Sequence, residues 1–303
     1  MKKLVIACMI GLAILSASSV NRGTRHETAL SLSAQAEEYY TGDYSFEALS
    51  ALAGSALESS AEAWSSPLCA ALHSLMNETR TGLPSYAATL TLFPKTDASG
   101  GSAEPLRFYS DDFGSLSRER VWPDSRGLYY HDGPGRDLHH LRPSAAEANF
   151  IRGTMTFGNV RDSFSSWETW PETGEPVFWY REDWNSGAGL LEVRDEIKGD
   201  VARILLYVWV TWGDADGGTC NLWTDLPAQG SGLEASDGLR VVESLDTLLE
   251  WLALDPVDTW ELGRNDAVQA LQGSRNDFID YPELAFLLFD REIPDMITPS
   301  GTG

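Results

Sequence analysis

The sequence predicts an α+β protein, mainly helical and built as a single domain, and three observations lead to this class. Apolar residues recur at spacings of three and four from Glu37 to about Arg80 and again through the C-terminal third, as in helices packed on a core. The central stretch 118–152 has instead the order strand, loop, strand, helix. A hydrophobic content of 43% with 11 Trp excludes a disordered chain, and 303 residues can bury a large core without disulfides.

The N-terminus has the pattern of an export signal. Lys2 and Lys3 precede an apolar run over about residues 4–17, which is too short to span a bilayer but suits a signal-peptide core. Cleavage could follow Ser18 in a small-residue stretch or Ala36 in an A-x-A match, and the sequence does not choose between them. The protein is therefore expected to be secreted or periplasmic.

These boundaries give three regions: a signal peptide and leader over residues 1–36, one domain over 37–291, and a disordered tail over 292–303. The mature chain has no other segment apolar enough to cross a membrane. Cys69 and Cys220 would remain after export, and either a disulfide or two buried thiols is allowed.

Two helices are expected over residues 37–80, followed by less regular structure. The alternation in residues 86–93 suggests a strand or an extended connection, and residues 94–105, rich in Pro, Asp, Ser and Gly, a surface loop. The aromatic-rich residues 164–184 are expected to form a loop-rich excursion packed on the core, with a base-stacking platform as the alternative.

The C-terminal third shows clearer helix signals. Residues 199–212 are apolar on nearly all sides, as in a buried helix. Asp255 followed by proline predicts a helix start, and Gly273 its end. Asp280 and Glu283 predict the cap of a last helix.

Charge is distributed unevenly along the chain. The net charge of −23 argues against broad attraction to nucleic acid or to an anionic membrane, so any contact with DNA must be local. The segment 118–161 holds seven Arg against five acids, and its charge of +2 leaves −25 for the rest. We expect a phosphate-handling patch in this segment.

Two side chains in the central stretch could bind a metal ion. The capping box Ser144-Ala-Ala-Glu147 predicts a helix from Ala145, with Asn149 in its second turn and Arg152 on the same face. The upstream strand carries Glu119, which the strand–loop–strand–helix order would bring near Asn149. A carboxylate and an amide oxygen suit Mg²⁺. The alternative is that Glu119 pairs with a surface Arg and Asn149 has no special role.

Four stretches, in this order, resemble the bacterial endonuclease I family: SRERVWPDS, GPGRDLHHLRPSAAEANFIRG, DEIKGDVARILLYV and LLEWLALDPVDTWELGRNDAVQALQGSRNDFIDYPELA. The resemblance implies a ββα-metal (His-Me finger) core and non-sequence-specific, Mg²⁺-dependent cleavage of DNA, with RNA as an open second substrate and Ca²⁺ or Mn²⁺ as alternative cations. It implies Glu119 and Asn149 as metal ligands and makes Arg136 and Arg152 candidates for holding the scissile phosphate. The nuclease is expected to be a monomer and to bind nucleic acid through its Arg-rich patch.

One position departs from the family pattern. Arg120 stands where the family has the His that acts as general base, and arginine cannot accept a proton at neutral pH. Three outcomes stay open. His139 or His140 could replace the base, a hydroxide held by the metal could give slow turnover with help from Arg120, or the chain could bind metal or nucleic acid without cutting it. An unrelated hydrolase has no support, because the sequence lacks the G-x-S-x-G, H-E-x-x-H, C-x-x-C and phosphate-loop motifs.

Overall fold

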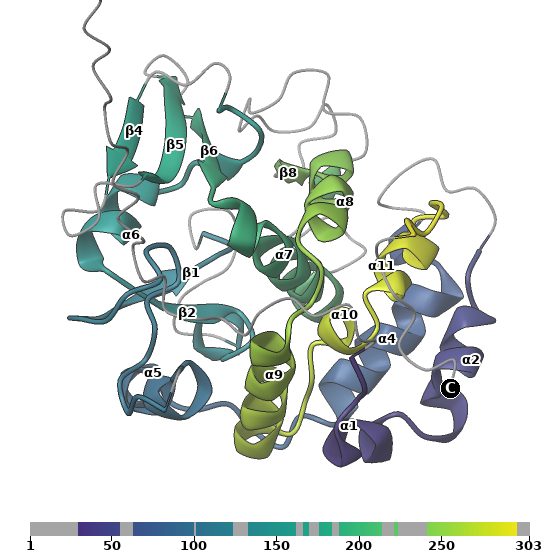
Figure 1. The fold of residues 1–303 in the computed structure, drawn as a ribbon. Coiled ribbons are helices and arrows are strands. Elements are labelled where there is room, and N and C mark those ends of the chain that lie inside the picture. Colours follow the sequence, from purple (N-terminus) through teal and green to yellow (C-terminus); the bar gives the residue numbers. More distant parts are fainter. Residues whose placement is uncertain are drawn as a thin grey trace, which may run out of the picture.

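The structure, a computed structural model, describes most of the chain between residues 30 and 295 (Figure 1). The described ranges are 30–54, 63–99, 101–123, 133–161, 166–169, 176–183, 188–213, 221–223 and 241–295. The expected signal core, Cys220 and the tail beyond residue 295 lie outside them. Among the described residues, no helix combines the length and the apolar character that crossing a bilayer requires.

The fold is mixed α and β, with helices predominating and small sheets among them, which agrees with the predicted α+β class. The helices are α1 (Ala34–Tyr39), α2 (Phe46–Ser50), α4 (Pro67–Glu78), α5 (Tyr86–Thr96), α6 (Ala146–Arg152), α7 (Lys198–Trp212), α8 (Leu245–Leu254), α9 (Thr259–Gln272), α10 (Asp277–Asp280) and α11 (Glu283–Leu288), with short 3-10 turns η1 (Gly42–Tyr44), η3 (Gly133–Arg136) and η4 (Asp195–Ile197). The strands are β1 (Ser117–Arg120), β2 (Leu141–Ser144), β3 (Thr156–Phe157), β4 (Ser166–Thr169), β5 (Pro176–Asp183), β6 (Ala188–Val193), β7 (Asn221–Trp223) and β8 (Val241–Ser244).

Serine caps divide the N-terminal helical region. Ser33, Ser45 and Ser66 each accept a hydrogen bond from a backbone N–H of the first turn, and so begin α1, α2 and α4. The helical periodicity over residues 37–80 is therefore correct, but it belongs to several short helices rather than two. Cys69, on α4, is a buried free thiol.

Residues 86–96 form the helix α5, so the expected strand over 86–93 is wrong. Ser85 caps the helix by accepting from the Ala88 N–H, and Thr89 and Phe93, one turn apart, are buried. The expected surface loop after it is also partly wrong, because Asp97 is fully buried and forms ion pairs with Arg142 (3.1 Å) and Arg264 (2.8 Å).

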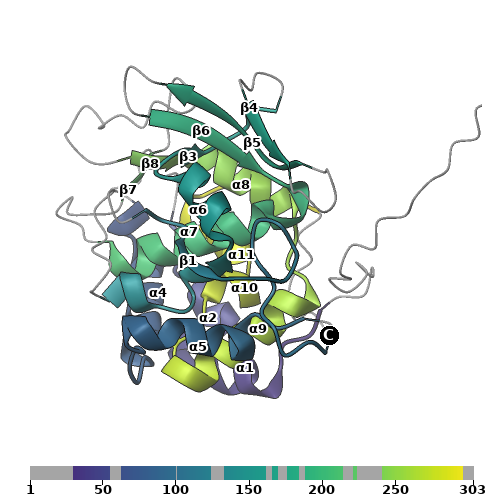
Figure 2. The same ribbon diagram turned by 90° about the vertical axis from the view of Figure 1, so that its left-hand side faces the viewer.

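The central stretch has the predicted order of elements. β1 pairs antiparallel with β2, with Glu119 opposite Arg142, and α6 follows β2 directly and packs against β1 (Figures 1 and 2). The predicted capping box is wrong in detail. Ser144 belongs to β2 and its hydroxyl donates to the Ala145 carbonyl, so α6 begins one residue later without a side-chain cap.

Where the structure describes the aromatic-rich region 164–184, it forms strands rather than a loop-rich excursion; Phe164, Trp170 and Trp184 lie outside the described residues. β4, β5 and β6 are antiparallel neighbours, and β3 joins the other edge of β6 in parallel. Phe178 on β5 is buried, while the next residue, Trp179, lies 3.9 Å beneath the Arg161 guanidinium. Phe178 and Trp179 thus lie on opposite faces of β5, as the pleat requires.

Helix α7 runs through the centre of the molecule and is buried on all sides except at its last residue, as predicted. Gly199 is required at its start, because a Cβ there would lie 1.9 Å from the Asp255 carbonyl oxygen. Asp255 accepts from the Gly199 N–H, so it does not cap the following helix. Helix α9 begins three residues later than predicted, after Asp258, and ends as predicted at Gly273, which has φ +88°.

The predicted cap of the last helix is also wrong. Asp280 lies at the end of α10, where its carboxylate receives the Arg275 guanidinium at 2.6 Å, and α11 begins at Glu283 without a side-chain cap.

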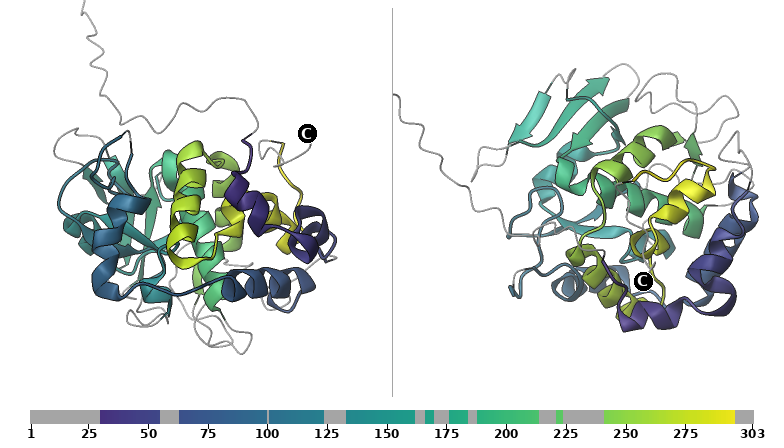
Figure 3. Two further views of the ribbon diagram at one scale, coloured as in Figure 1. Left: turned by 90° about the horizontal axis from the view of Figure 1, so that it is seen from below. Right: turned by 45° about the vertical axis from the view of Figure 1, so that its right-hand side comes forward.

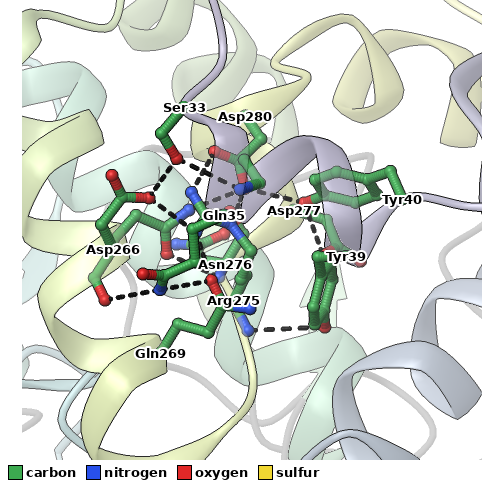
Figure 4. A network of polar contacts seen from close by, with 12 residues as sticks. Ser33, Gln35, Tyr39, Tyr40, Asp266, Gln269, Arg275, Asn276, Asp277 and Asp280 are labelled. Carbon is green, nitrogen blue, oxygen red and sulfur yellow. Dashed lines mark hydrogen bonds and ion pairs between the residues drawn. The ribbon is translucent and has the colours of Figure 1, made fainter.

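Polar contacts join the N-terminal residues of the described chain to α9 and α10 near its C-terminal end (Figures 3 and 4). Ser33 and Gln35 bond to Asp266 on α9, and the Tyr40 hydroxyl contacts Asp277 and Asp280 on α10. One hydrophobic cluster extends from Ala36 to Phe289, so α1 belongs to the core. A cut after Ala36 would remove the Ser33 and Gln35 contacts.

Candidate nuclease site

The Glu119 carboxylate is buried between β1 and α6. Its side chain is 1% exposed, and its Oε1 accepts a hydrogen bond from the Tyr109 hydroxyl (3.0 Å) and lies 3.6 Å from Arg152 Nε. Burial raises its pKa to about 7 against the opposing effect of Arg152. The second oxygen, Oε2, has no hydrogen-bond partner among the described residues. One carboxylate oxygen is thus held in place while the other is left unsatisfied.

Asn149 and Arg152 lie one turn apart on α6 and bracket Glu119. Asn149 Nδ2 donates to the Arg118 carbonyl (2.8 Å), which is bonded to the Glu119 nitrogen, and Arg152 Nη2 donates to the Val121 carbonyl (2.6 Å). The amide nitrogen of Asn149 is thus held by β1. The structure therefore brings Asn149 to the Glu119 segment of β1, as the spacing predicted.

Arg152 is fully buried, and both of its Nη atoms donate hydrogen bonds to backbone carbonyls. Besides the Val121 carbonyl it donates to the Gly153 carbonyl (2.9 Å), and its guanidinium lies 4.5 Å from the centre of the Phe157 ring. This geometry suits a residue that positions Glu119 better than one that holds a phosphate. Arg136 lies in η3 and is half-buried, and no contact between it and Glu119 is present.

The two histidines are buried behind the hairpin. His140 Nε2 accepts from the Trp122 N–H (2.9 Å), and its Nδ1 contacts the Pro134 carbonyl (2.7 Å). His139 Nε2 contacts the Ser274 carbonyl (2.8 Å). Burial lowers the pKa of each to about 4. Both rings are 0–1% exposed, so the geometry gives neither a path to a water molecule at Glu119.

On the opposite face of β1, Arg118 and Arg120 both pack on Tyr86 of α5. The Arg118 guanidinium lies 4.2 Å from the Tyr86 ring centre and donates to Thr89 (2.6 Å), while Arg120 Nη1 donates to the Tyr86 hydroxyl (3.2 Å). Figure 2 shows α6, β1 and α5 on one side of the molecule. The expected Arg-rich patch is smaller than the charge count suggested, because Arg142 and Arg152 are buried.

Tyr109 was missed at the sequence level. It lies ten residues before Glu119, is fully buried, and belongs to no motif that predicts a site. Its hydroxyl fixes the position of Glu119 Oε1. An aromatic residue in an irregular segment gives no sequence signal for such a contact.

The donor set fits a hard divalent cation with few protein ligands. The described residues contain no group of three or more His, Cys, Asp and Glu suited to a metal ion. Mg²⁺ needs only one or two protein groups and keeps several waters. Glu119 Oε2, which has no hydrogen-bond partner among the described residues, and Asn149 Oδ1 are oxygen donors of this kind.

The fold and this geometry define a class: an α+β protein with a candidate oxygen-donor site where a strand pair meets the next helix. The sequence model of the Endonuclease I family matches residues 107–283, and the chain belongs to this family. The resemblance noted in the sequence is thereby confirmed, and the matched segment contains Glu119, Arg120 and Asn149.

The chain is also similar to two curated proteins. It is 37% identical over 175 residues to an extracellular ribonuclease of Bacillus amyloliquefaciens, covering 57% of this chain and 53% of that protein. The identity to an extracellular ribonuclease of Bacillus subtilis (strain 168) is 37% over 178 residues, with the same shares of the two chains. The chain spans about half the length of these relatives.

Proposed function

We propose that the protein is a secreted, divalent-metal-dependent nuclease that hydrolyses phosphodiester bonds without sequence specificity, with β1, β2 and α6 as its ββα-metal (His-Me finger) core. The observation that carries the proposal is the buried, unsatisfied Glu119 Oε2 in a chain of the Endonuclease I family. Leaving such an atom without a partner costs about 1–3 kcal/mol, which a bound cation would offset. We propose DNA as the main substrate. RNA is the second candidate, because the two similar proteins are named extracellular ribonuclease.

Glu119 and Asn149 would hold the cation, with Mg²⁺ first and Ca²⁺ or Mn²⁺ as alternatives. When bound, the cation supplies positive charge that polarises the phosphodiester and stabilises the leaving oxygen. Tyr109 and Arg152 hold Glu119 Oε1, which would leave Oε2 available to the cation. The substrate would meet a local positive surface to which Arg118 contributes. The contacts of Arg118 with Tyr86, Thr89 and Ala87 are with uncharged groups, so they do not neutralise its charge.

Proton transfer is the weak step of the proposed reaction. Arg120 has no acceptor atom, and His139 and His140 are buried against backbone groups. General-base catalysis contributes about 10²–10⁴ in rate, so we infer slow cleavage by the native protein. These same facts favour a second candidate function, in which the chain binds metal or nucleic acid without cutting it.

Degradation of plasmid DNA and of a long RNA by the purified protein, with Mg²⁺ or with chelator, tests the proposal. We expect slow, Mg²⁺-dependent cutting by the native protein and a gain of about 10²–10⁴ for Arg120→His. Arg118→His is the comparison variant, since it places the same imidazole two residues away on the same strand face. Because it also removes a charge of the proposed substrate surface, it should cut no faster than the native protein. Adding Glu119→Gln to Arg120→His should abolish the gain.

The outcomes separate the two candidate functions. Rapid native cleavage would contradict the inferred loss of the base. No cleavage by either the native protein or Arg120→His, with binding of nucleic acid retained, would favour the non-catalytic function.

A further inference from the structure

Phe150 is an exposed aromatic residue directly beside the proposed site. Its side chain is 85% exposed, whereas the next most exposed large apolar side chain among the described residues, Leu254, is 46% exposed. It follows Asn149 in α6, so its Cα lies about 3.8 Å from the Cα of the proposed metal ligand. Packing does not explain a phenyl ring at this position, because the ring buries almost no surface.

The rest of α6 sets the direction of the ring. Asn149 and Arg152 face β1, where they bond to its backbone. The opposite, solvent-facing side carries Ala146 and Glu147, which are exposed and lie one turn before Phe150. Because the Glu147 carboxylate repels phosphate, a strand bound here would present a base to the ring and keep its phosphates away from this face.

We propose that Phe150 is a specificity-determining residue that stacks on an unpaired nucleobase of the bound strand. This inference rests on the proposed nuclease function, and it deepens that function by naming single-stranded nucleic acid as the preferred substrate. An aromatic ring stacks on any base whose face is open, and that face is covered in a duplex. The contact would therefore favour unpaired strands without favouring a base sequence.

The test compares the native protein with Phe150→Ala and Phe150→Trp on one labelled 12-nucleotide strand, on the same strand in a duplex, and on strands with a single abasic site at successive positions. Leu254→Ala is the matched control, because it shortens an exposed apolar side chain on α8. Binding is followed by fluorescence anisotropy with chelator present, and cleavage is followed in Mg²⁺.

Stacking on one base contributes about 5- to 150-fold to affinity, so Phe150→Ala should weaken single-strand binding by a factor in this range and leave duplex binding unchanged. Phe150→Trp should restore binding, and Leu254→Ala should have no effect. The native protein should lose a similar factor at one abasic position, whereas Phe150→Ala should lose nothing more there.

Equal binding of single strands by the native protein and Phe150→Ala would overturn the proposal. A change in sedimentation on Phe150→Ala with unchanged oligonucleotide affinity would also overturn it, in favour of contact with a second copy of the chain. Binding without cleavage would refute the nuclease function alone, since the affinities still decide the role of Phe150. If the native protein neither binds nor cleaves any of these oligonucleotides, both proposals fail.

Discussion

Mild acid should destabilise the fold through His139, and the effect can be worked out from its environment. Burial lowers the pKa of this imidazole from 6.5 to about 4, although Asp137 beside it favours the charged form. The unfolded chain therefore binds a proton at a higher pH than the folded protein does. The stability that depends on the neutral ring is fully present above about pH 6.5 and is lost as the pH falls towards 4.

Between pH 7.5 and pH 5 this single group should lower the free energy of unfolding by about 2 kcal/mol, from the two pKa values. Other groups titrate in the same window. His140 acts in the same direction, and Glu119 in the opposite one, because burial raises its pKa to about 7. A difference between the native protein and a His139 variant isolates the contribution of His139 from these.

His139→Gln is the suitable variant, because a glutamine amide can still donate to the Ser274 carbonyl that His139 Nε2 contacts. Urea unfolding followed by tryptophan fluorescence at pH 7.5, 6 and 5 gives the free energies for both proteins. The variant should lose about 2 kcal/mol less than the native protein over this range. Equal losses would refute the reasoning, since His139 would then titrate alike in the folded and unfolded states.

Two further predictions concern Tyr109 and two glycines, Gly263 within α9 and Gly273 directly after it. Tyr109→Phe removes the hydroxyl that holds Glu119 Oε1 and should lower Mg²⁺ affinity by about 10- to 100-fold in isothermal titration calorimetry; an unchanged affinity would mean that this contact does not position the carboxylate. Gly273→Ala should destabilise the protein by about 1–3 kcal/mol in urea unfolding, because φ is +88° and the added Cβ would lie 2.3 Å from a backbone oxygen of Thr79. Gly263→Ala is its control on the same helix, where nothing lies within 4 Å, and it should stabilise by up to about 1 kcal/mol; the opposite order of the two variants would contradict this account.

The sequence predicted the parts of the site that depend on local patterns. The order of β1, β2 and α6 follows from short-range signals, and it was enough to bring Asn149 to the strand of Glu119. Helix α7 was predicted because its own residues are apolar on nearly all sides. Such features need no knowledge of partners distant in the chain.

Other features depend on partners that the sequence does not reveal. Arg142 and Arg152 were counted in a surface patch, but ion pairs with Asp97 and Glu119 make their burial possible. The segment that forms α5 was predicted as extended because its residues alternate in polarity. The same residues also place Thr89 and Phe93 on one face of a helix. Where two periodicities fit one segment, tertiary packing decides between them.

The contacts of α1 impose an order of events on synthesis. Tyr40 meets Asp280, which follows it by 240 residues, and Ser33 meets Asp266 after 233. A nascent chain presents these residues first and their partners on α9 and α10 almost last, so these contacts form only near the end of translation. Closing so long a loop is slow, which makes a late docking step between the chain ends the expected limit on the folding rate.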